Sequence, residues 1–218
     1  MLIDLAKLRA TVRFRGDYQN VKKFPSSDVN TEIQGAFGEF WELIANVHEG
    51  HWDTSAQVST IVDQAYVALP VGTWRVQGID RLDGSDWFPL TKVSVAKRNR
   101  FGSQTDTPSA YRLSARGAEL YATPNAVITL RVMYTPSAPL LQEAGERDWF
   151  NGWEEFVIVS TLLRLARLDK QPLKDFIDAV DAAAKRITSG AGEREASEPE
   201  YLNLHEGGSV DIWDRSLE

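Results

Sequence analysis

The sequence contains no cysteine among its 218 residues and only three histidines. Without cysteine there is no disulfide framework, no thiolate-bound metal and no cysteine nucleophile. No uninterrupted apolar stretch approaches the roughly 18 residues that a membrane helix needs. Charged residues interrupt each short apolar run at the start of the chain, which is unlike a signal peptide. We therefore expect a soluble protein that enters no membrane and does not depend on an oxidising compartment.

The residues that are present suit an ordinary globular protein, with 43% hydrophobic and 25% charged side chains. A chain of this length can bury a sizeable core without covalent cross-links. The formal net charge is −7. This acidic excess argues against a dedicated nucleic-acid binder, which usually presents a basic face.

The charge is unevenly distributed along the chain. Residues 190–218 hold eight acidic and two basic residues, so the remainder is close to neutral. The opening segment has the opposite balance, because only Asp4 and Asp17 accompany its six basic residues before Phe24. These are Lys7, Arg9, Arg13, Arg15, Lys22 and Lys23. Opposite charges at the two ends can steer association between copies, but solvated termini explain them equally well.

Residues up to about Glu49 are predicted to be helical. Pro25-Ser26-Ser27-Asp28 offers several N-cap residues, and apolar side chains then recur at the spacing of one buried helical face. They are Val29, Ile33, Ala36, Phe37, Phe40, Trp41, Ile44 and Val47. Gly50 is the expected stop, and Leu2–Val12 is expected to form a shorter helix.

From about His51 to Pro136 the apolar period changes to two, which predicts short antiparallel strands. Asp83-Gly84 is a hairpin signal, and the longest strand is expected over Ala126–Tyr134. Further strands are expected at Tyr66–Pro70, Trp74–Ile79, Tyr111–Leu113 and Glu119–Tyr121. The pattern is typical of a small sandwich or curled sheet.

The chain then returns to helix. Trp153–Leu168 is apolar on most faces and is expected to be the central buried helix. The next helix should begin at Pro172 and end at Ser189-Gly190. The short connection between these two helices predicts an antiparallel hairpin.

The predicted fold class is therefore α+β. Amino-terminal helices (1–50) and a carboxyl-terminal antiparallel helical hairpin (151–190) form a helical bundle, into which a small antiparallel β-sandwich or curled sheet (51–150) is inserted. An extended acidic arm (191–218) follows, because its composition is polar and lacks sustained periodicity.

No constellation of residues with catalytic content is present. The sequence has no phosphate-binding loop, dinucleotide fingerprint or nucleophile elbow. His48 and His51 lack the i, i+4 spacing of a zinc protease on a continuing helix. Without a nucleophile–base pair we expect no enzyme activity and no cofactor.

Two features remain as candidate binding sites. The first is a basic loop in which Lys92, Lys97, Arg98 and Arg100 meet no acidic residue; it is a candidate contact for a partner or for DNA phosphates, or is simply solvated. The second is the acidic arm, whose large apolar residues indicate docking to a partner. They are Tyr201, Leu202, Leu204, Ile212 and Trp213.

The order of these features resembles the head–tail connector (adaptor) proteins of tailed bacteriophages. The residues that carry the resemblance lie between Val29 and Ile187. They are Tyr66-Val67-Ala68-Leu69-Pro70, Trp74–Asp80, Tyr111-Arg112-Leu113, Glu119–Pro124, Val132-Met133-Tyr134-Thr135-Pro136 and Gly152-Trp153-Glu154-Glu155. The basic loop and the Trp213 arm have no counterpart that we can match to this pattern.

The resemblance implies a virion structural protein at the virion neck, assembled in the host cytoplasm. Such proteins form a ring of about twelve copies beneath the portal protein, join the head to a tail-side protein and line the DNA channel, with only transient contact to passing DNA. The arm would then dock on the portal or a neighbouring copy, and the basic amino-terminal segment would contact the next subunit. Another neck or tail-completion protein is an alternative. So is a β-rich module that binds a glycan or peptide through Trp52, Trp74 and Trp87.

Overall fold

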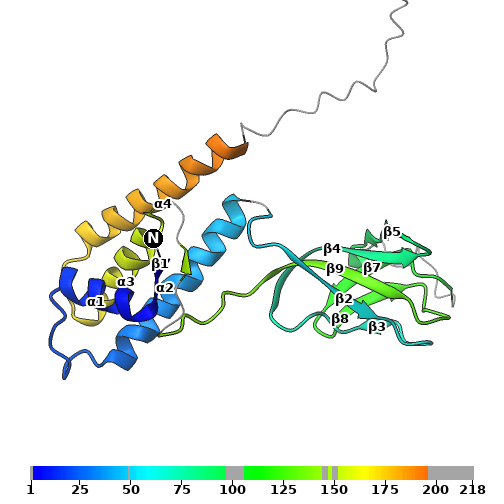
Figure 1. Ribbon diagram of the computed structural model, residues 1–218, viewed down its shortest axis with the longest axis horizontal. Coiled ribbons are helices and arrows are strands. Elements are labelled where there is room, and N and C mark those ends of the chain that lie inside the picture. Colours follow the sequence, from blue (N-terminus) through cyan, green and yellow to red (C-terminus); the bar gives the residue numbers. More distant parts are fainter. Residues whose placement is uncertain (1, 49, 97–105, 144–146, 149–151, 196–218) are drawn as a thin grey trace, which may run out of the picture.

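The computed structural model describes residues 2–48, 50–96, 106–143, 147–148 and 152–195. Within these ranges the chain forms four helices, two four-stranded sheets and one two-stranded sheet. The predicted α+β class is confirmed. Figure 1 shows the helices gathered on one side of the molecule and the two larger sheets on the other. None of the helices in the described ranges is long and apolar enough to span a membrane.

The amino-terminal half of the helical side consists of α1 (Leu5–Arg15) and α2 (Ser26–Val47). The expected helix over Leu2–Val12 is displaced toward the carboxyl end, because the Asp4 side chain caps α1 by accepting from the Lys7 backbone N–H at 2.7 Å. The residues before this cap instead form β1 (Leu2–Ile3), which pairs antiparallel with β10 (Arg147–Asp148). The predicted apolar face of α2 is confirmed from Val29 to Ile44, where every member is buried.

The carboxyl-terminal half of the helical side consists of α3 (Glu154–Leu168) and α4 (Lys174–Glu195). The apolar residues of α3 are buried as predicted, from Phe156 to Leu165. The helix stop expected at Ser189-Gly190 is wrong, since α4 continues to Glu195. A single glycine costs a helix only about 1 kcal/mol and does not end it by itself. The arm therefore follows Glu195 rather than Gly190.

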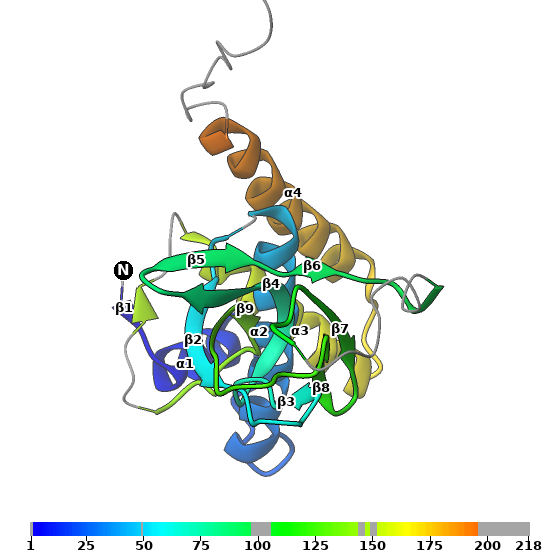
Figure 2. The same ribbon diagram turned by 90° about the vertical axis from the view of Figure 1, so that its right-hand side faces the viewer.

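The β side contains two four-stranded sheets. The first has the order β2 (Thr54–Ser59), β9 (Thr129–Pro136), β4 (Thr73–Asp83), β5 (Asp86–Pro89). The second has the order β3 (Tyr66–Val67), β8 (Gly117–Tyr121), β7 (Ala110–Ser114), β6 (Thr91–Lys92). Alternation along β9 directs Leu130 and Val132 into a core that both sheets share. Figure 2 looks onto this side of the molecule.

Two expectations about the strands need correction, and a third is confirmed. The longest strand is β4 rather than the one predicted over Ala126–Tyr134, which starts only at Thr129 as β9. Not all pairs are antiparallel, because β6 runs parallel to β7. The hairpin predicted at Asp83-Gly84 is confirmed, and Gly84 there adopts φ +63°, which glycine tolerates without steric cost.

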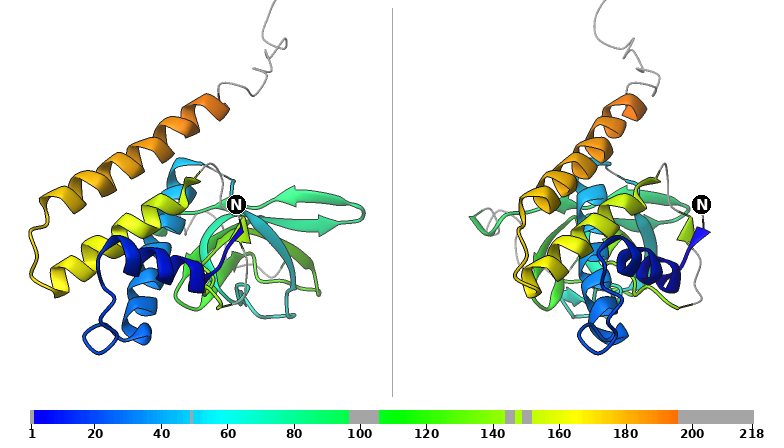
Figure 3. Two further views of the ribbon diagram at one scale, coloured as in Figure 1. Left: turned by 60° about the vertical axis from the view of Figure 1, so that its left-hand side comes forward. Right: turned by 90° about the vertical axis from the view of Figure 1, so that its left-hand side faces the viewer.

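The helical side and the β side have separate hydrophobic cores. The helical core includes residues of all four helices, so segments from both ends of the chain meet in it. Trp41 of α2 lies where this core approaches the β side: its Nε1 donates to the Pro136 carbonyl at 2.9 Å, and its ring stacks on Trp52 with a centroid distance of 3.9 Å. The views in Figure 3 show α4 running back alongside α3 and then extending beyond the other helices.

Candidate functional site

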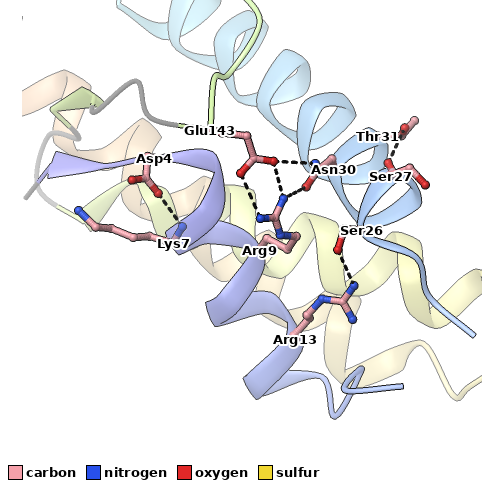
Figure 4. A network of polar contacts seen from close by, with 9 residues as sticks. All are labelled: Asp4, Lys7, Arg9, Arg13, Ser26, Ser27, Asn30, Thr31 and Glu143. Carbon is pink, nitrogen blue, oxygen red and sulfur yellow. Dashed lines mark hydrogen bonds and ion pairs between the residues drawn. The ribbon is translucent and has the colours of Figure 1, made fainter. Parts of the chain in front are cut away.

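The basic amino-terminal segment lies against other parts of its own chain. Arg9 of α1 donates from Nη1 to Glu143 Oε1 at 2.6 Å and from Nη2 to Oε2 at 3.0 Å. Asn30 of α2 contacts both residues (Figure 4). The hydrogen bonds from Arg9 hold the pKa of Glu143 below its usual value. This contact joins α1, α2 and the segment that returns from the β side.

Arg13 and Arg15 are held in the same way. Arg13 donates from Nη1 to the Tyr18 carbonyl and from Nη2 to the Phe24 carbonyl, both at 2.8 Å. It thereby closes the loop between α1 and α2 with one guanidinium. Arg15 donates from Nη1 to Glu155 in the first turn of α3 at 2.7 Å.

Lys23 completes this set through an ion pair with Asp169 at the end of α3. Hydrogen bonds from Lys23 and Gln171 hold the pKa of Asp169 below its usual value. Arg9, Arg13, Arg15 and Lys23 are thus engaged within the chain, and the side chains of Lys7 and Lys22 lie at the exposed surface. The attraction that this segment offers a neighbour is therefore weaker than its sequence suggests.

A clamp between α2 and α3 was not foreseen from the sequence. Arg164 of α3 donates to Glu39 at 2.7 Å and to Glu32 at 3.3 Å, with its guanidinium lying across Gly35. A Cβ atom at Gly35 would lie 2.7 Å from Nη1. Burial lowers the pKa of Arg164, but the hydrogen bonds and charges of the two glutamates raise it further than burial lowers it. The only signal in the sequence was a glycine in a helix interior, with glutamates three residues before it and four after it.

An open groove of about 470 Å³ adjoins this clamp, between α2, α3 and α4. Its apolar lining comes from Leu43, Phe156, Leu163, Val180 and Ala184. Its charged lining comes from Glu39, Glu42, Arg164 and Arg167. We call this hollow the α2–α4 groove. It combines an apolar floor with charges of both signs.

A second groove of about 430 Å³ lies between α2 and the segment that returns from the β side. Gln34 fixes that segment, because its Nε2 donates to the Pro139 carbonyl at 3.2 Å and its Oε1 accepts from the Leu141 N–H at 2.8 Å. The lining includes no charged residue, and Leu140 stands exposed beside it. This surface offers nothing that would select a charged partner.

Of the two candidate binding sites predicted from the sequence, the basic loop and the acidic arm, only one residue is described. Lys92 lies exposed in β6, whereas Lys97, Arg98 and Arg100 lie outside the described residues, as do Tyr201, Leu202, Leu204, Ile212 and Trp213 of the arm.

The three tryptophans proposed for a binding groove do not gather at one place. Trp52 stacks on Trp41, whereas Trp74 lies under Arg75 and Trp87 lies under Arg131, with 4.5 and 4.6 Å between guanidinium carbon and ring centroid.

The histidine pair offers no metal centre in the described part of the chain. The His48 and His51 rings are 6.0 Å apart, and His48 packs against Trp153 at a centroid distance of 5.2 Å. Among the described residues, no three histidine, aspartate or glutamate side chains converge as metal ligands.

No protein-family model matches the sequence, and no curated protein matches it.

Proposed function

We propose that this chain is a head–tail connector of a tailed bacteriophage, which forms a ring beneath the portal protein and joins it to a tail-side protein. The observation that carries the proposal is the architecture. Helices from both ends of the chain share one core, a β region is inserted between them, and α4 extends beyond the other helices. In this proposal the four helices act as a bundle, and α3 and α4 form its antiparallel hairpin.

The distribution of charge supports a role in assembly rather than in DNA binding. A ring is built from heterologous contacts, in which one face of a subunit meets a different face of the next. The body is close to neutral in net charge, and Arg9, Arg15 and Lys23 are held in internal ion pairs, so little unpaired basic charge is available to retain passing DNA. The acidic arm supplies the charged and apolar segment that docks on the portal protein. The chain acts at the virion neck after assembly in the host cytoplasm.

The test is to image the purified chain and to measure its mass, alone and mixed with the portal protein of the same phage. Closed rings, or a stable complex with the portal, are expected. A chain that stays monomeric both alone and in the presence of the portal protein, and that binds a glycan tightly, would support the β-rich binding module instead. Truncation after Glu195 retains every described residue of the helical core, so loss of portal binding in that variant assigns the docking to the arm.

A further inference from the structure

We propose that the α2–α4 groove is the docking site for the arm of this chain, with Ile212 and Trp213 as the buried anchors. The groove offers a volume of about 470 Å³, within the range of pockets that bury small ligands. Its floor includes Phe156 and Leu163, which are buried core residues. An indole and a neighbouring aliphatic side chain are the groups that such a surface takes.

The charges at the rim match the residues that flank these anchors. Among the described residues, the Arg167 guanidinium and the Glu42 carboxylate form no hydrogen bond or ion pair, and both side chains are exposed. The arm places an acid on either side of its anchors and a base beyond them, in the order Asp211-Ile212-Trp213-Asp214-Arg215. An acid of the arm can therefore pair with Arg167, and Arg215 can pair with Glu42. The groove beside Gln34 has no charged lining and offers no such match.

The length of the chain allows the arm to return to the groove of its own subunit. From Ala184 in the groove to the end of α4 at Glu195, the helix rises about 17 Å at about 1.5 Å per residue. Residues 196–212 span at most about 60 Å when extended. A tethered segment of this reach acts at an effective concentration in the millimolar range. A modest intrinsic affinity is therefore enough to fill the groove in an isolated subunit.

Docking of this kind gives the arm a binding site on its own chain that competes with any other partner. The arm then has to leave the groove before it can bind elsewhere, or it moves to the groove of an adjacent copy. The contact involves only this chain, so the inference stands or fails without reference to a portal protein.

The absence of cysteine permits a direct test in the full-length protein. Ala184→Cys places a thiol in the groove, Ser216→Cys places one beside Trp213, and these are the only thiols in the chain. Mild oxidation joins them only if their Cα atoms approach within about 7 Å. The control pair combines Ser216→Cys with Ser55→Cys, an exposed residue of β2. Non-reducing electrophoresis and mass spectrometry then measure the disulfide yield and distinguish links within a chain from links between chains.

The expected result is a much higher yield for the groove pair than for the control pair, and a fall of about tenfold when Trp213→Ala is added to the groove pair. A link within one chain or between two chains supports the proposal, because the groove holds the arm in both cases. Equal yields for the two pairs overturn it. An unchanged yield with Trp213→Ala overturns the assignment of the anchor. Ser216→Cys is common to both pairs, and Ala184 is only partly buried against the helical core, so the two pairs differ mainly in where the second thiol lies.

Discussion

The clamp on α2 predicts opposite outcomes for two glycine substitutions in one helix. Gly35 and Gly38 both lie inside α2, where alanine is favoured over glycine by about 1 kcal/mol. A Cβ atom at Gly38 meets no atom within 4 Å, whereas at Gly35 it meets Arg164 Nη1 at 2.7 Å. Gly38→Ala should therefore raise the free energy of unfolding by about 1 kcal/mol.

Gly35→Ala carries the same gain in helix propensity but displaces the Arg164 guanidinium from Glu32 and Glu39. Hydrogen bonds to charged groups contribute about 1.5–3 kcal/mol each, and exposed ion pairs contribute about 0.2–1 kcal/mol. The Arg164 side chain is 30% exposed, so about 2 kcal/mol for the two contacts together is a reasonable value. The net expectation is a loss of about 1 kcal/mol relative to wild type, and of about 2 kcal/mol relative to Gly38→Ala.

Urea unfolding followed by circular dichroism measures both variants, with the m-value checked for constancy. Repeating Gly35→Ala in an Arg164→Met background isolates the clash, because with the guanidinium gone the alanine should stabilise by about 1 kcal/mol. If Gly35→Ala stabilises the wild-type chain as much as Gly38→Ala does, the clamp has no energetic role and the reasoning is refuted.

Three further substitutions test the contacts that hold the molecule together. Trp41→Phe removes the hydrogen bond to the Pro136 carbonyl and should lower the free energy of unfolding by about 1–3 kcal/mol; an unchanged urea midpoint contradicts this. Asp169 has a lowered pKa in the folded protein, so its ion pair with Lys23 stabilises fully above the ordinary carboxyl pKa and is lost as the pH falls through the folded value. Asp169→Asn should accordingly be less stable than wild type near pH 7, and a stability gap that does not close in acid would exclude this linkage. Arg13→Met opens the loop between α1 and α2 and should speed its limited proteolysis, whereas equal cleavage rates would show that the loop closes without the guanidinium.

Local patterns were sufficient to predict the helices and several strands, because their signals lie within a few residues of each other. The face of α2 from Val29 to Ile44 follows the helical period, and the Asp83-Gly84 turn lies between strands that pair as neighbours. The prediction failed where two local signals competed. Asp4 outweighed the apolar run beginning at Leu2, and helix propensity continued α4 past Gly190.

The contacts of the candidate site join residues that are far apart in the chain. Hydrophobic periodicity, which is a local pattern, cannot predict them. Arg9 meets Glu143, and Arg164 meets Glu32 and Glu39, only because the β region returns the chain to the helices. From the sequence alone, the basic residues near the start therefore indicate a charge available to a neighbouring subunit or to solvent, and not these internal contacts. The parallel pairing of β6 with β7 was missed for the same reason, since it depends on how the chain crosses between the sheets.

The full-length pairing of β2 with β9 brings the first and last strands of the β region together, with Thr54 opposite Tyr134. Replacing everything between these strands with a tight turn would leave the path of the helices unchanged, because the gap to be bridged is only the width of one strand pair. The β region is therefore joined to the helical side through two adjacent, paired strands. Because the two cores are separate, the β region can be changed in size between these two strands while the helical core keeps its own packing.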